Sequence, residues 1–212
     1  MISLVPKDDW AAGFSAGIRT ASFSTCAVPE GMVDLYIYGE EKKMQSDTFS
    51  DHDQMSRYII REVDPDSELD ILRNLFREYV EELGDDLDFQ GFQEELKNLP
   101  GQYSPPRGSL YLALVEGSPA GCIALRNIDG TTCEMKRLFV RPEYRSMKIG
   151  RALVETLLAD ARSRGYRTMK LDTLERLEAA YQLYRSLGFR ETAPYTYNPL
   201  PGAVFMETDL QA

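Results

Sequence analysis

The sequence is poor in the side chains that most often bind metal ions or form disulfides. It has one histidine and three cysteines in 212 residues. Cys26, Cys122 and Cys133 lie far apart and are odd in number, which predicts reduced thiols in a cytoplasmic protein. His52 stands in a polar stretch with no cysteine or histidine nearby. We therefore expect no zinc site and no metal cofactor.

Long apolar runs and clustered basic residues are also missing. No stretch approaches the ~20 apolar residues that a membrane-spanning helix needs, and Lys7, Asp8 and Asp9 interrupt the N-terminus before any leader-like apolar run. The net charge of −10 disfavours nucleic acid, because phosphate contacts need clustered lysine and arginine. We expect a cytoplasmic protein with neither a membrane nor a nucleic acid as partner. Its acidity either attracts a cationic substrate or only maintains solubility.

The character of the sequence changes near residue 57. Residues 1–56 are predicted to be an N-terminal extension of unknown role. Within it, residues 33–38 are suited to a short strand, whereas residues 39–56 are polar and without periodicity, which is typical of a flexible segment. From residue 57 onward, apolar residues recur in regular patterns. Residues 57–212 are therefore predicted to form one domain.

This regular part predicts alternating strands and helices. Strands are expected at residues 58–63, 110–115, 121–128, 131–140, around 169–171, 189–192 and 204–207, and helices at residues 69–80, 89–99, 149–161 and 180–187. Asp129 and Gly130 lie between two apolar runs and predict a tight hairpin turn with positive φ at both residues. The helix at 149–161 lies between two strands, which implies a parallel crossover. The expected fold class is α/β (α+β), with a mixed, mostly antiparallel central sheet of about seven strands flanked by helices.

One predicted strand runs through a short turn directly into a helix. Residues 134–152 read EMKRLFVRPEYRSMKIGRA. Unpaired N–H groups at a helix start favour an anion, small residues such as Ser146 and Gly150 let a phosphate approach the backbone, and Arg145 and Arg151 add positive charge. The turn is either a diphosphate site or an ordinary connection with solvated arginines. It matches neither the P-loop pattern nor the dinucleotide-binding glycine pattern.

The same turn resembles the coenzyme A-binding segment of the GCN5-related N-acetyltransferase (GNAT) family. That segment has the signature [RQ]-x-x-G-x-[GA] after a V-x-P-x-[YF]-R strand exit. Arg145 and Gly150 match the signature, and Lys148 stands at its first glycine. A second motif, YRSLGF at residues 184–189, follows in family order, and Leu177 replaces an asparagine that the family often carries before it. The resemblance covers residues 57–210 and implies the GNAT fold.

The resemblance also implies acetyl-CoA as co-substrate. The main chain of Leu138 and Val140 is then expected to pair with its pantetheine arm where two sheet strands part, and a main-chain N–H near Leu138 is expected to stabilise the oxyanion. Main-chain donors of residues 146–151 are expected to hold the pyrophosphate. The residues expected to bind the cofactor are Leu138, Phe139, Val140, Arg145, Ser146, Met147, Lys148, Ile149, Gly150 and Arg151.

Two side chains are candidates for catalysis. Glu134, on the strand before the turn, is expected to take a proton from the attacking amine, unless it is only a carboxylate at the edge of the cleft. Tyr184 matches the family's general acid, and a phenol is protonated at neutral pH; without the resemblance it reads as a core aromatic, and Tyr181 is the second candidate. Glu82 and Tyr197 are weaker candidates for contacting the acceptor. Glu82 belongs to an acidic cluster that is otherwise a solvated loop, and Tyr197, in the last loop, otherwise only covers the end of the sheet.

These implications favour N-acetyl transfer from acetyl-CoA to a primary amine of a small molecule or peptide, by direct attack in a ternary complex. The alternative is a non-catalytic coenzyme A-binding regulatory module, for which the departures at Lys148 and Leu177 leave room. Transfer of a longer acyl group stays open. The family often forms homodimers, so a homodimer is a further expectation.

Overall fold

The structure is a computed structural model that describes residues 58–211. The predictions for the first 57 residues, among them the strand at 33–38, Cys26 and His52, lie outside the described residues, and the domain boundary stays a prediction. The elements in chain order are β1 (Ile59–Glu62), α1 (Leu69–Leu83), η2 (Asp88–Gln90), α2 (Phe92–Asn98), η3 (Gly101–Tyr103), β2 (Ser109–Val115), β3 (Ser118–Asn127), β4 (Thr132–Val140), η4 (Pro142–Met147), α3 (Ile149–Ser163), β5 (Thr168–Leu174), α4 (Glu178–Ser186), β6 (Arg190–Glu191) and β7 (Ala203–Asp209).

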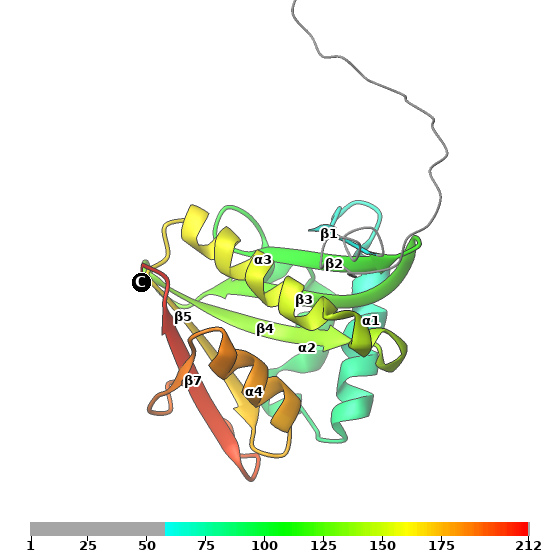
Figure 1. Cartoon of the computed structure of the whole chain (residues 1–212). Coiled ribbons are helices and arrows are strands. Elements are labelled where there is room, and N and C mark those ends of the chain that lie inside the picture. The colour runs from blue at the N-terminus through cyan, green and yellow to red at the C-terminus, as the bar shows by residue number, and fades with distance from the viewer. Residues whose placement is uncertain (1–57, 212) are drawn as a thin grey trace, which may run out of the picture. The chain divides into compact units, whose positions relative to one another are not determined.

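The strands form one seven-stranded sheet with the order β1-β2-β3-β4-β5-β7-β6 (Figure 1). β4 and β5 pair in parallel, and α3 makes the crossover between them. All other neighbours in the sheet are antiparallel. The predicted fold class, a mixed and mostly antiparallel sheet flanked by helices, is therefore confirmed.

The helices cover both faces of the sheet. α1 and α2 pack on one face and α3 and α4 on the other (Figure 1). α1 buries Leu72, Leu75 and Phe76 completely, as expected for apolar residues three and four positions apart on one helix face. Each such burial stabilises the fold by about 1.5–3 kcal/mol. Within residues 58–211, no helix combines the length and the apolar character that crossing a membrane requires.

The predicted hairpin between β3 and β4 is confirmed, but its predicted turn geometry is wrong. Neither Asp129 nor Gly130 has a positive φ. Instead, Oδ1 of Asp129 accepts hydrogen bonds from the backbone N–H groups of Thr131 and Thr132, each at 2.8 Å. The carboxylate thus closes a wider loop than a two-residue turn, an option that aspartate offers and that apolar patterning does not reveal. A positive φ occurs instead at Glu116, in the turn between β2 and β3.

β4 and β5 part along their length, as the resemblance implied. Their pairing covers only Thr132–Glu134 and Thr168–Lys170, although both strands continue. On the other side of β4, a bulge shifts the register with β3, and Arg137 within it has a φ of 57°. The Arg137 guanidinium forms a buried ion pair with Glu95 of α2, with Nη2 and Oε2 2.5 Å apart. The helix layer therefore holds the bulge at the point where the sheet opens.

Candidate active site

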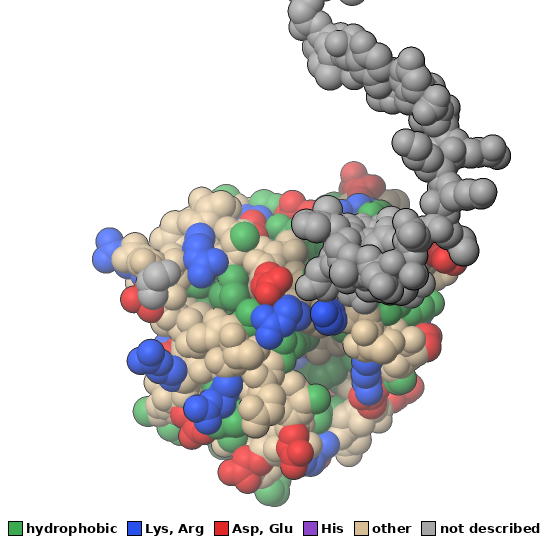
Figure 2. Space-filling view, viewed as in Figure 1, with side chains coloured by type: hydrophobic (Ala, Val, Ile, Leu, Met, Phe, Trp, Pro, Cys, Tyr) green, Lys and Arg blue, Asp and Glu red, His purple; other side chains and the backbone are tan. Residues whose placement is uncertain are grey.

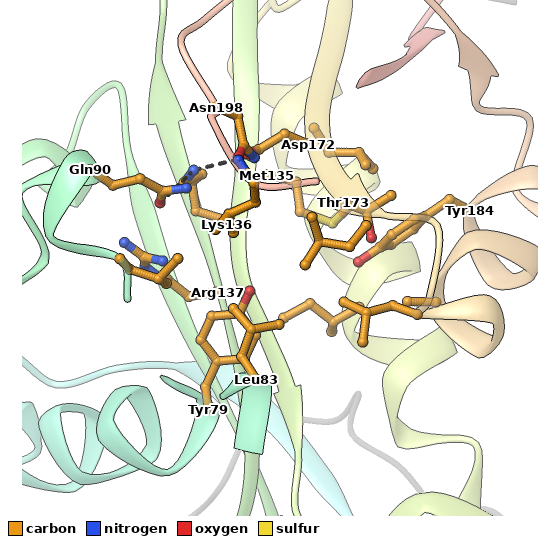
Figure 3. Close-up of a pocket in the computed structure, with 17 residues that line it drawn as sticks. Tyr79, Leu83, Gln90, Met135, Lys136, Arg137, Asp172, Thr173, Tyr184 and Asn198 are labelled. Atoms are coloured by element: carbon orange, nitrogen blue, oxygen red, sulfur yellow. Dashed lines mark hydrogen bonds and ion pairs between the residues drawn. The ribbon is translucent and has the colours of Figure 1, made fainter. Parts of the chain in front are cut away.

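The parted strands open onto two adjoining cavities. The outer cavity, of about 700 Å³, lies between the end of β4, the turn into α3, α1 and the start of α4. The inner cavity, of about 100 Å³, is lined mainly by β4, β5 and their flanking elements (Figure 3). The side chains that line both are Tyr79, Leu83, Leu138, Leu177 and Ala180. Leu177, which replaces the family's asparagine, therefore lies where the two cavities meet.

Most residues expected to bind the cofactor line the outer cavity. Those that do so are Leu138, Phe139, Val140, Arg145, Lys148, Gly150 and Arg151. The side chains of the other three do not: Ser146 is exposed, Met147 is half-buried and Ile149 is completely buried in the core. These three were expected to contribute backbone N–H groups, and that contribution stays a prediction.

Lys148 keeps the turn that the family signature builds with glycine. It ends η4 and precedes α3 with φ 60° and ψ 17°. This left-handed conformation is unstrained for glycine but costs energy for a residue with a Cβ. The substitution therefore leaves the geometry of the turn intact at an energetic cost. The first turn of α3 still lines the outer cavity through Gly150 and Arg151.

Two arginines of this turn are already hydrogen-bonded to protein groups. Nε of Arg145 donates to the backbone carbonyl of Val140 at 3.0 Å. Nη2 of Arg145 donates to both carboxylate oxygens of Glu82, at 2.5 and 2.6 Å. Nη2 of Arg151 donates to Oγ of Ser186 at 2.6 Å. On the face seen in Figure 2, basic side chains are likewise interspersed with acidic ones.

The inner cavity is lined by an ion pair that the sequence did not predict. Nζ of Lys136 on β4 lies 3.2 Å from Oδ1 of Asp172 on β5 and 3.2 Å from Oε1 of Gln90 (Figure 3). Nδ2 of Asn198 donates to Oδ2 of Asp172 at 2.8 Å. Burial raises the pKa of the Asp172 carboxyl, but Lys136 and Asn198 outweigh it and leave this pKa below its ordinary value. A stable carboxylate therefore faces the inner cavity.

Tyr184 reaches the inner cavity from α4, across from Tyr79 of α1 (Figure 3). Its ring is buried and packs edge-on against Phe189, with ring centroids 5.9 Å apart. Burial raises the pKa of the Tyr184 phenol above its ordinary value. The hydroxyl is therefore protonated at neutral pH, which is the form that a proton donor needs. Both expected features of Tyr184, the core aromatic and the cavity hydroxyl, are present in one residue.

Glu134, the other candidate for catalysis, is completely buried outside both cavities. One carboxylate oxygen accepts from the Arg126 guanidinium, and the other accepts from the Tyr195 hydroxyl at 2.9 Å and lies 3.7 Å from Nζ of Lys136. The carboxylate is thus held by protein donors, and its role as the base stays a prediction.

The two residues expected near the acceptor also lie away from the inner cavity. Glu82 lines the outer cavity, beside the residues expected to bind the cofactor. Tyr197 is 75% exposed, packs edge-on against Phe89 and lines neither cavity. Its neighbour Asn198 faces the inner cavity instead. Asp172 takes a polar position in the alternation of β5, as Lys170 does, so the local pattern carried no signal for its ion pair with Lys136.

The comparisons with known proteins agree with this geometry. A model of the acetyltransferase (GNAT) family matches residues 69–189. A solved GNAT acetyltransferase of Staphylococcus aureus shares the fold, with a TM-score of 0.62, 23% identity and coverage of 72% of this chain and 99% of that chain. An uncharacterised N-acetyltransferase of Schizosaccharomyces pombe is 43% identical over 145 residues, which cover 68% of this chain and 89% of the relative. The chain therefore belongs to the GNAT acetyltransferase family.

A further solved structure adds a bound ligand in a relative. A putative acetyltransferase of Salmonella typhimurium, solved with its cofactor acetyl-CoA, has a TM-score of 0.53 and 22% identity. The alignment covers 73% of this chain and 95% of that chain. At this identity the likeness concerns the fold.

Proposed function

We propose that this chain transfers an acetyl group from acetyl-CoA to a primary amine of a small molecule or peptide, by direct attack in a ternary complex. The observation that carries the proposal is the opening between β4 and β5. It joins an outer cavity lined by the family's cofactor motif to an inner cavity lined by Tyr184. In this proposal the two reactants meet at this opening, and their proximity supplies much of the rate acceleration.

The outer cavity has the chemistry that acetyl-CoA requires. Arg145, Lys148 and Arg151 supply positive charge for the diphosphate, and Leu138 and Leu183 supply an apolar wall for the pantetheine arm. Acetyl-CoA supplies the activated thioester. The backbone of Leu138 lies at the bulge, outside the register pairs between β3 and β4. In this proposal its N–H stabilises the oxyanion that forms as the amine attacks.

Proton transfer is assigned to two groups of the inner cavity. Tyr184 donates its hydroxyl proton to the departing thiolate. Asp172 is the carboxylate that lines the same cavity, and in this proposal it receives the amine's proton. Glu134 is linked to this cavity through Lys136, which lies within 4 Å of both carboxylates. We therefore assign Glu134 the task of positioning Lys136 and Tyr195.

Paired substitutions test this assignment. Asp172→Asn should shift the acid limb of the pH–rate profile, because it removes the carboxylate that faces the amine. Glu134→Gln should lower activity without that shift, because Glu134 acts through Lys136. The opposite result, a shift with Glu134→Gln alone, would restore Glu134 as the base. Circular dichroism of both variants separates these effects from loss of the fold.

The competing function is a coenzyme A-binding regulatory module without catalysis. Release of free thiol from acetyl-CoA, measured with a panel of amino acids, peptides and polyamines, discriminates between the two. Turnover with any amine supports the transferase, and calorimetric binding of acetyl-CoA without thiol release supports the module. Tyr184→Phe is the matched variant, since it removes one hydroxyl and leaves the ring that packs on Phe189.

A further inference from the structure

Acidic residues of α1 and of the turn after it form ion pairs with arginines that follow β4 and β5. Each pair joins segments far apart in the sequence. The pairs are Glu78 with Arg141, Glu82 with Arg145, and Asp85 with Arg176. Glu78 and Glu82 are four residues apart and therefore share one face of the helix.

The middle pair differs from the first in its position. Glu82 and Arg145 both line the outer cavity, whereas neither Glu78 nor Arg141 does. Nη2 of Arg145 donates to both oxygens of Glu82, and its Nε is fixed by the carbonyl of Val140. The Glu82 carboxylate therefore occupies the guanidinium that the cofactor motif provides for a diphosphate.

We propose that Glu82 is a built-in competitor for the diphosphate of acetyl-CoA, and that it sets the affinity of the site for this cofactor. The inference rests on the proposed function, because it requires acetyl-CoA in the outer cavity. A diphosphate that binds Arg145 replaces the Glu82 carboxylate as the partner of the guanidinium. The Glu82 carboxylate then remains next to the bound diphosphate. Both the lost ion pair and the like-charge repulsion oppose binding.

The exposure of the pair makes this exchange feasible. The side chains of Arg145 and Glu82 are 48% and 46% exposed. Exposed ion pairs contribute little, and repulsion near the surface is screened by water, so Glu82→Gln should tighten acetyl-CoA binding by about three- to tenfold. The amide of glutamine keeps the size of the side chain and removes its charge.

Product release provides a second consequence. Free coenzyme A carries the same diphosphate, so re-formation of the Glu82–Arg145 pair favours its departure as well. Glu82→Gln should lower the KM for acetyl-CoA, and it should also lower kcat where release of coenzyme A limits turnover. A residue with a purely structural role would not produce this pattern of a lower KM together with a lower kcat.

Titration calorimetry with three ligands tests the proposal. Acetyl-CoA and coenzyme A carry the diphosphate, and S-acetylpantetheine lacks it. We expect Glu82→Gln to tighten the first two and to leave the third unchanged. The matched control is Glu78→Gln, which breaks the neighbouring ion pair outside the outer cavity and should change none of the three.

The possible failures are distinguishable. An unchanged Kd for acetyl-CoA in Glu82→Gln, or equal tightening of S-acetylpantetheine, would overturn the competition while leaving the proposed function standing. If neither the wild-type protein nor Glu82→Gln binds acetyl-CoA, the proposed function fails and the competition fails with it. Thermal unfolding without ligand shows whether each variant is folded before titration.

Discussion

The substitution Lys148→Gly tests whether the backbone at Lys148, in the turn between η4 and α3, is strained. Lys148 has a φ of 60°. A residue with a Cβ costs about 1–2 kcal/mol in the left-handed region, and glycine removes this strain. The greater freedom of glycine in the unfolded chain offsets about 0.5–1 kcal/mol of the stability gained in this way. The net expectation is about 0.5–1 kcal/mol of stabilisation. For a domain of this size that is a rise in Tm of about 1–4 °C.

Thermal unfolding without ligand measures this shift, and two control variants isolate its cause. Lys148→Ala removes the ammonium but keeps the Cβ, so it should not raise Tm. Glu116→Gly relieves a φ of 50° in the β2–β3 turn, away from both cavities, and should raise Tm similarly. Equal Tm values for Lys148→Gly and Lys148→Ala would refute the strain argument.

The remaining predictions concern the sheet opening and its charges. Gly121→Ala should destabilise the fold by about 1–3 kcal/mol in chemical denaturation, because a Cβ there lies 2.5 Å from the backbone oxygen of Phe139. Glu95→Gln should cost about 3–5 kcal/mol, since it leaves Arg137 buried without its partner. Burial raises the pKa of Glu95, but Arg137 outweighs it and holds this pKa below the ordinary 4.5. The pair should therefore stabilise the fold at neutral pH and lose that contribution as the pH falls below about 4.5. In an acid-unfolding experiment, the free energy of unfolding of Glu95→Gln should accordingly depend less on pH in this range than that of the wild type. Tyr184→Phe should lower kcat by about 10²–10⁴-fold with the Kd for acetyl-CoA unchanged.

Local pattern determined the elements and the cofactor motif. Apolar spacing predicted α1, and the burial of Leu72, Leu75 and Phe76 confirms it. The same holds for the strands, since pleat alternation and helix periodicity depend on neighbours a few residues away. The family's signature has a glycine at position 148, and the structure shows that the backbone of Lys148 takes the left-handed conformation there.

The geometry of the turn after β3 could not be predicted from the local sequence pattern. Asp129 and Gly130 suited a two-residue turn, yet the Asp129 side chain accepts the backbone hydrogen bonds that close the loop. Competition between side-chain and backbone partners decides such cases, and it depends on geometry rather than on composition.

The pairing of the charged residues around the cavities depended on tertiary structure alone. Glu82 meets Arg145 across 63 residues of sequence, and Lys136 meets Asp172 across 36. The packing of α1 on the sheet brings the first pair together, and the neighbouring positions of β4 and β5 bring the second pair together. Glu134 likewise became a buried, hydrogen-bonded carboxylate only when β3 and the β6–β7 loop closed around it. The sequence by itself thus determined the family and the cofactor turn, whereas the partners of its charged residues followed from long-range packing that no local pattern encodes.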